Sequence, residues 1–149
     1  MKPWVTLGIA TMPGGAELEL LRHDEDYVIR TEGYDLMTSR AHSSEDAMMA
    51  LACPHPPPGA RVLVGGLGMG YTLRGVLTLL PEQAAVTVVE LVPEVIEWNR
   101  GPLGPLAGDP LDDPRTELVC GDVRGVIEAG RDSFDAILLD IDNGPDAAS

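Results

Sequence analysis

Three carboxylates that follow apolar runs of the sequence have the types and positions to do chemistry together. Glu90 follows "VTVV", Asp122 follows "ELVCG", and Asp140 follows "AILL". Carboxylate oxygens can accept hydrogen bonds from ribose hydroxyls or from a base amino group, and a carboxylate can take a proton from an attacking amine. Each acid also has a structural interpretation: Glu90 as a solvated strand end, Asp122 as a helix N-cap, and Asp140 as a turn residue.

A glycine-rich turn precedes these acids in the stretch "RVLVGGLGMGYTLRGVLTLL", where Gly66, Gly68 and Gly70 give G-x-G-x-G. Residues without Cβ atoms permit a tight turn and let a ligand lie directly on the backbone. The helix that follows offers unpaired N–H groups to polar or anionic atoms. Close packing of helix on strand would also explain the pattern. A nicotinamide-binding protein would usually show G-x-G-x-x-G, whereas Tyr71 and Thr72 follow the last glycine here.

Alternating strand and helix patterns after residue 60 would position these residues. The sequence predicts strands at 61–65, 85–91, 116–122 and 134–140, and helices at 71–80, 92–103 and 123–130. The continuous apolar runs are typical of parallel strands covered on both faces. We therefore predict an α/β fold with an open, mainly parallel, Rossmann-like sheet and helices on both faces. Ligands of such sheets bind at the carboxyl ends of the strands, where the strand order reverses.

The segment before this sheet has the pattern of a small antiparallel β meander followed by a helix. Short alternating runs predict strands at 17–22, 27–30 and 34–38, and "SSEDAMMALAC" predicts a helix with acids in its first turn. The proline-rich "PHPPPG" then stops the helix. We expect an N-terminal module over residues 1–58 and a nucleoside-binding α/β domain over residues 59–149.

The composition narrows the function classes. A net charge of −14, from 24 Asp and Glu against 10 Lys and Arg, disfavours nucleic acid. It would attract cations such as polyamines, and it also has the simpler interpretation that acidity keeps a protein soluble. The histidines lack metal-ligand spacing, so no metal is expected. Cys53 and Cys120 form no C-x-x-C pair and are predicted to be buried thiols. Without a membrane-spanning run or signal peptide, we expect a cytoplasmic protein with no membrane partner.

Taken together, these segments resemble the class I S-adenosylmethionine-dependent fold and, within it, the spermidine/spermine synthase family. The likeness covers about residues 15–146. It rests on "VLVGGLGMGYTLRGVL", "VTVVELVPEVIEWNR", "DDPRTELVCGDVRGVI" and "FDAILLDIDNGP". It implies S-adenosylmethionine or its decarboxylated form as co-substrate, and a small-molecule amine as acceptor.

The resemblance also implies roles for individual residues. The glycine turn would hold the tail of the nucleoside, Glu90 the ribose and Asp122 the adenine, and Asp140 would be the catalytic aspartate. The implied co-substrate-binding set is Gly65, Gly66, Gly68, Met69, Gly70, Glu90, Leu91, Gly121, Asp122 and Val123. Asp142 and Asn143 would contact the acceptor.

Some residues depart from the family pattern. Met69 and Asn143 stand where the family normally has aspartates, and "AHSSEDAMM" replaces a Tyr-His-Glu helix signature. Aminopropyl transfer, methyl transfer to a small molecule and non-catalytic nucleoside binding therefore all stay open. The family fold has further strands after the fourth, so the resemblance implies a C-terminally truncated chain. The strand at 134–140 would then be an open edge, and we expect a homodimer.

Overall fold

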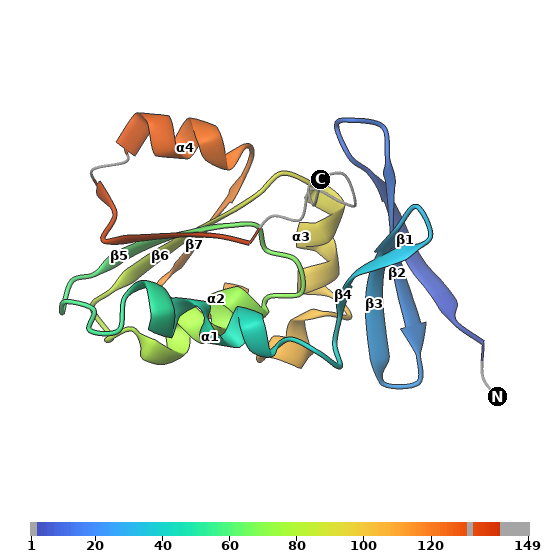
Figure 1. Cartoon of the computed structure of the whole chain (residues 1–149), viewed down its shortest axis with the longest axis horizontal. Helices are drawn as coiled ribbons and strands as arrows, with labels where there is room; N and C mark the ends of the chain where they lie inside the picture. Colours follow the sequence, from blue (N-terminus) through green and yellow to red (C-terminus); the bar gives the residue numbers. More distant parts are fainter. Residues whose placement is uncertain (1–2, 131–132, 141–149) are drawn as a thin grey trace. The chain divides into compact units, whose positions relative to one another are not determined.

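The computed structural model describes residues 3–130 and 133–140, which form two compact units of residues 3–42 and 43–140 (Figure 1). The first unit is one antiparallel sheet in the order β1-β2-β3-β4. This sheet confirms the predicted meander and adds a strand before it. Its strands are β1 (Val5–Thr11), β2 (Glu17–His23), β3 (Asp26–Thr31) and β4 (Tyr34–Thr38).

The second unit is a parallel sheet with helices on both faces, as the sequence predicts. Its strand order is β7-β6-β5-β8, and every neighbouring pair is parallel. Helices α1 and α2 cover one face and α4 covers the other (Figure 1). The strands are β5 (Arg61–Gly65), β6 (Ala85–Glu90), β7 (Thr116–Cys120) and β8 (Ala136–Leu139). The helices are α1 (Ser43–Ala52), α2 (Tyr71–Leu79), α3 (Pro93–Arg100) and α4 (Val123–Gly130), with 3₁₀ turns η1 (Gly104–Ala107) and η2 (Pro110–Asp112).

The ends of the helices follow local chemistry. Gly70 precedes α2 in a left-handed conformation, and Pro81 follows its end, where a helix would need an N–H that proline lacks. Pro93 begins α3, a favoured position for proline. The helix predicted to continue to residue 103 stops at Arg100, because Gly101 leaves the helical conformation.

The strand order places the glycine turn at the switch point of the sheet. The chain runs from β5 to β6 to β7 on one side, and then returns to pair β8 with the other side of β5. Val62, Leu63 and Val64 of β5 are fully buried, as a central strand covered on both faces requires. Gly65 therefore ends the strand beside which the order reverses, where open α/β sheets bind ligands.

Helix α1 packs closely on α2. A Cβ atom at Gly75, in the middle of α2, would lie 2.8 Å from the Asp46 carbonyl oxygen of α1. No side chain fits at that distance, which explains why a glycine occupies the interior of a helix. The helix predicted within residues 1–58 thus lies in the second compact unit, and the division into domains at residues 58 and 59 stays a prediction.

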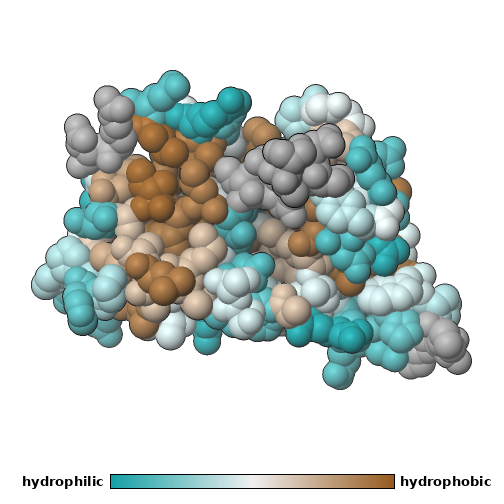
Figure 2. Space-filling view, in the orientation of Figure 1, coloured by the Kyte–Doolittle hydropathy of each residue, from teal (hydrophilic) through white to brown (hydrophobic). Residues whose placement is uncertain are grey.

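Strand β8 pairs with β5 and with no other strand in the part of the chain that the structure describes. Ala136 and Leu138 are buried, but Ile137 is 37% exposed and Leu139 is 53% exposed. Apolar side chains gather on the surface over β8 and beneath α4 (Figure 2). The prediction of a strand buried on both faces therefore fails for alternate residues. The expected homodimer stays a prediction.

Within residues 3–130 and 133–140, no helix combines the length and the apolar composition needed to cross a membrane. The same residues contain no group of three or more His, Cys, Asp or Glu side chains that could hold a metal ion. The expectation that the protein uses no metal stays a prediction.

Candidate functional site at the carboxyl edge of the parallel sheet

The glycine turn between β5 and α2 has a backbone that other residues would rarely adopt. Gly66, Gly68 and Gly70 have φ angles of 102°, 52° and 88°. These values lie in the left-handed region that glycine enters without steric cost. The Gly66 N–H donates a 2.8 Å hydrogen bond to the Val89 carbonyl, which ties the turn to the neighbouring strand. The expected tight turn is present at this edge of the sheet.

Glu90, the last residue of β6, holds this turn from the side. Glu90 is 8% exposed, and its carboxylate accepts two backbone hydrogen bonds, from Leu67 N–H at 2.9 Å and from Val92 N–H at 3.0 Å. The interpretation as a solvated acid is therefore wrong. An ionised carboxylate has about four acceptor positions, so two stay open beside these bonds. The contact of Glu90 with a ribose stays a prediction.

Asn99 of α3 also supports the turn, and sequence reasoning did not identify it. Its side chain is 4% exposed, and its amide nitrogen donates to the carbonyls of Gly68 at 2.7 Å and Val95 at 2.8 Å. A Cβ at Gly70 would lie 3.2 Å from the Asn99 Oδ1 atom. The helix pattern indicates that Asn99 is buried, since it shares a face with Val95 and Trp98, but it does not indicate the partner.

Asp122 caps the N-terminus of α4, as its structural interpretation predicts. Its Oδ1 accepts a hydrogen bond from the Arg124 backbone N–H at 2.9 Å at the start of α4. The Arg124 guanidinium donates to Oδ2 at 2.7 Å, and this hydrogen bond lowers the pKa of the Asp122 carboxyl below its usual range. The neighbouring Gly121 N–H donates to the Glu90 carbonyl at 2.9 Å. The adenine contact stays a prediction.

Asp140 follows β8 on the other side of the turn and is partly buried. Its backbone N–H donates a 2.7 Å hydrogen bond to the Gly65 carbonyl. Its Oδ2 accepts a 2.7 Å hydrogen bond from the hydroxyl of Thr72, in the first turn of α2. Sequence reasoning named Thr72 only as a departure from the nicotinamide motif, and nothing in the local sequence indicated this partner.

The other predicted residues differ in what they present at this edge. Met69 is 2% exposed and Val123 is 7% exposed, whereas Leu91 is 46% exposed. A Cβ at Gly121 would meet no atom within 4 Å, so space is open above it. Asp142 and Asn143 lie outside the described residues. The carboxyl ends of all four strands and the glycine turn thus share one edge of the sheet.

Cys120, the last residue of β7, is exposed, and Cys53 is partly exposed. The prediction of two buried thiols is therefore wrong. Cys120 is the last residue of its strand, at the carboxyl ends of the strands, where its side chain is open to solvent. Cys120 is paired in register with Glu90. Its thiol is a chemical probe next to the candidate site.

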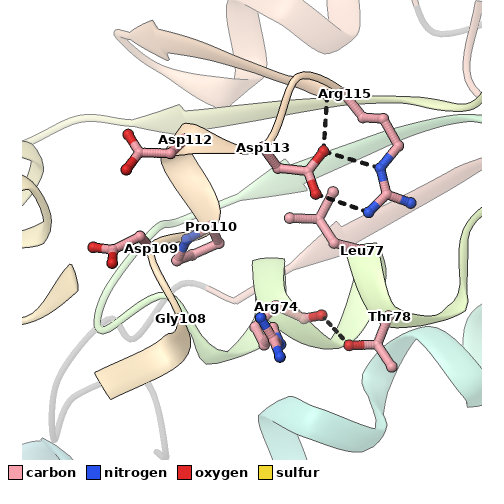
Figure 3. Close-up of a pocket in the computed structure, with 9 residues that line it drawn as sticks. All are labelled: Arg74, Leu77, Thr78, Gly108, Asp109, Pro110, Asp112, Asp113 and Arg115. Carbon is pink, nitrogen blue, oxygen red and sulfur yellow. Dashed lines mark hydrogen bonds and ion pairs between the residues drawn. The ribbon is translucent and has the colours of Figure 1, made fainter. Parts of the chain in front are cut away.

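A separate hollow of about 420 Å³ lies beside α2 (Figure 3). Its wall includes Asp113, whose two carboxylate oxygens accept hydrogen bonds from the Nε and Nη2 atoms of Arg115 at 3.0 and 2.8 Å. These hydrogen bonds lower the pKa of Asp113. No residue predicted for the site lines this hollow, which is formed by Arg74, Leu77, Thr78, Gly108, Asp109, Pro110, Asp112, Asp113 and Arg115.

The sequence matches a known protein family. Residues 42–149 match the spermine/spermidine synthase domain. The chain belongs to this family. The match includes the glycine turn, Glu90, Asp122 and Asp140, and it confirms the resemblance on which the sequence analysis relied.

Curated members of the spermine/spermidine synthase family are longer than this chain. A polyamine aminopropyltransferase of Korarchaeum cryptofilum is 37% identical over 81 residues, which cover 54% of this chain and 25% of that protein. Polyamine aminopropyltransferase 2 of Pseudomonas aeruginosa is 35% identical over 105 residues, which cover 68% of this chain and 28% of that protein. The chain thus spans less than a third of the length of both relatives.

Solved structures of the family share the fold. A spermidine synthase in complex with the transition state analogue AdoDATO superposes with a TM-score of 0.71 at 24% identity, over 91% of this chain and 47% of that chain. The spermidine synthase of Thermotoga maritima gives the same TM-score and identity, and 46% of that chain is covered. This likeness confirms the predicted fold class.

Proposed function

We propose that this chain forms the nucleoside-binding part of an aminopropyltransferase, which uses decarboxylated S-adenosylmethionine and an amine acceptor. Family membership and relatives named as polyamine aminopropyltransferases support this proposal. The observation that carries it is the position of Asp140, hydrogen-bonded through its N–H to Gly65 and through its carboxylate to Thr72, next to the glycine turn.

The residues present fit a nucleoside. The turn offers a backbone with no Cβ atoms at three left-handed positions, so a ligand can approach it closely. Glu90 keeps acceptor positions for ribose hydroxyls while it holds the turn. Asp122 would accept from the adenine amino group either beside Arg124 or after that exposed ion pair opens, which costs little at a surface.

When bound, decarboxylated S-adenosylmethionine supplies an electrophilic aminopropyl carbon on a positively charged sulfur, which leaves as the neutral thioether methylthioadenosine. The acceptor amine forms the new C–N bond as the C–S bond breaks, and the electron pair of that bond goes to sulfur. Asp140 takes the proton that the amine loses, at its carboxylate. The acidic surface of the protein favours a cationic acceptor.

The test is Asp140→Asn, assayed by mass spectrometry of the products formed from decarboxylated S-adenosylmethionine and a diamine. Asparagine keeps an acceptor for the Thr72 hydroxyl but cannot take a proton. We expect kcat to fall by about 10²–10⁴-fold, while methylthioadenosine still raises the melting temperature. If turnover is unchanged, Asp140 is not the base. If the wild-type protein instead makes S-adenosylhomocysteine from S-adenosylmethionine, methyl transfer replaces the proposal.

A further inference from the structure

The hydroxyl of Thr72, the second residue of α2, bonds to a part of the chain that is distant in sequence. Threonine in a helix commonly donates back to the carbonyl four residues earlier, and Thr78 of the same helix does so, with a 2.8 Å hydrogen bond to the Arg74 carbonyl. Thr72 donates instead to the Asp140 carboxylate, which lies 68 residues later in the sequence. The two threonines of α2 therefore have different roles.

The Thr72 side chain is 1% exposed, so its hydroxyl is withdrawn from water. A buried hydroxyl needs a partner, and a valine of the same shape would fill the space without that need. The Met48 sulfur also lies near the hydroxyl, at 3.7 Å, but a thioether is a weak acceptor. The hydroxyl has one proton, and the 2.7 Å contact to the carboxylate is the length of a charge-assisted bond.

This hydrogen bond joins two segments whose relative position matters for the proposed reaction. Thr72 lies in the first turn of α2, two residues after Gly70, which ends the glycine turn. Asp140 leaves the end of β8, where its N–H is already bonded to the Gly65 carbonyl. The backbone bond holds the main chain of Asp140, and the Thr72 bond holds one oxygen of its carboxylate.

We propose that Thr72 is a positioning residue, which orients the Asp140 carboxylate relative to the nucleoside held by the glycine turn. This inference rests on the proposed function, in which Asp140 accepts the amine proton. The segment that holds the nucleoside would thus also orient the carboxylate that takes the proton. A misplacement of about 1 Å in such a group can cost roughly 100-fold in rate.

The experiment compares Thr72→Val with Thr72→Ser, and uses Thr78→Val as a matched control in the same helix. Thr72→Val removes the donor and keeps the shape, Thr72→Ser restores the donor, and Thr78→Val removes a hydroxyl that bonds only within the helix. We expect Thr72→Val to lower kcat by about 10–100-fold with a KM for the nucleoside near that of the wild type. Thr72→Ser recovers most of the lost rate, and Thr78→Val matches the wild type.

A purely structural role for Thr72 predicts a different outcome: Thr72→Val lowers the melting temperature but leaves kcat unchanged, and that result would overturn the inference. A second measurement does not depend on turnover. The carboxyl ¹³C resonance of Asp140 should shift in Thr72→Val, return in Thr72→Ser and stay in place in Thr78→Val. If the wild type forms no product but the resonance behaves this way, the proposed function fails and the hydrogen-bond role stands.

Discussion

Replacing Glu90 by glutamine tests whether this carboxylate builds the glycine turn before any ligand binds. Glutamine has nearly the same shape but only one acceptor oxygen, so its NH₂ group would face one of the two backbone N–H donors, of Leu67 or Val92. A hydrogen bond to a charged group contributes about 1.5–3 kcal/mol, and a buried donor left unsatisfied costs about 1–3 kcal/mol. Leu67 and Val92 are only 1% and 6% exposed, so water cannot readily replace the partner that either N–H loses.

We therefore expect Glu90→Gln to lower the free energy of unfolding by about 2–4 kcal/mol in the absence of ligand. For a chain of this length, that corresponds to a melting temperature lower by about 4–16 °C. Urea denaturation should show a lower midpoint with an unchanged m-value, since the fold itself is retained. Glu97→Gln is the control, because Glu97 is exposed on α3 and, among residues 3–130 and 133–140, no backbone N–H donates to its side chain.

The alternative is that Glu90 serves the ligand alone. In that case Glu90→Gln would unfold at the same urea concentration as the wild type and would lose only affinity for methylthioadenosine. That result would refute the structural role assigned to the two hydrogen bonds. Destabilisation equal to that of Glu97→Gln would refute it as well.

Two further predictions use groups at other places in the second unit. The Arg115 hydrogen bonds lower the pKa of Asp113 below its usual 3.8, so their contribution is full above that pH and is lost as the pH falls through the folded-state pKa. Asp113→Asn should therefore cost about 1–2 kcal/mol near neutral pH and progressively less below pH 3.8, as measured by urea denaturation at each pH; a difference independent of pH would contradict this. In a Cys53→Ser background, saturating methylthioadenosine at ten times its Kd should slow maleimide labelling of Cys120 by about tenfold, and an unchanged rate would place the nucleoside elsewhere.

Local patterns in the sequence predicted the parts of the fold that local chemistry determines. The apolar run of β5, the glycines after it and the proline at the start of α3 each constrain the backbone where they stand. Their order along the chain then indicated an alternating α/β sheet. Gly75 is a further local signal, since a glycine inside a helix indicates that another backbone lies close, as the Asp46 carbonyl of α1 does.

The contacts that build the site could not be predicted in the same way. Glu90 bonds to a backbone N–H 23 residues earlier, Asn99 to a carbonyl 31 residues earlier, and Thr72 to a carboxylate 68 residues later. No periodicity specifies such partners, because they depend on how separate elements meet. The prediction that Cys120 is buried failed for a related reason: the composition of a strand does not show which of its ends lies open to solvent.

The pairing of β8 with β5 joins the last described strand to the first strand of its sheet. The Arg61 N–H donates to the Asp135 carboxylate across a separation of 74 residues, and the Asp135 N–H donates to the Arg61 carbonyl. Closing a loop costs entropy before the contacts across it stabilise the chain, so we expect this pairing to form late in folding. Asp140 would then reach its position after the glycine turn and Glu90 have reached theirs. A nascent or partly unfolded chain could already hold the turn and Glu90 while it still lacks the residue proposed to take the proton.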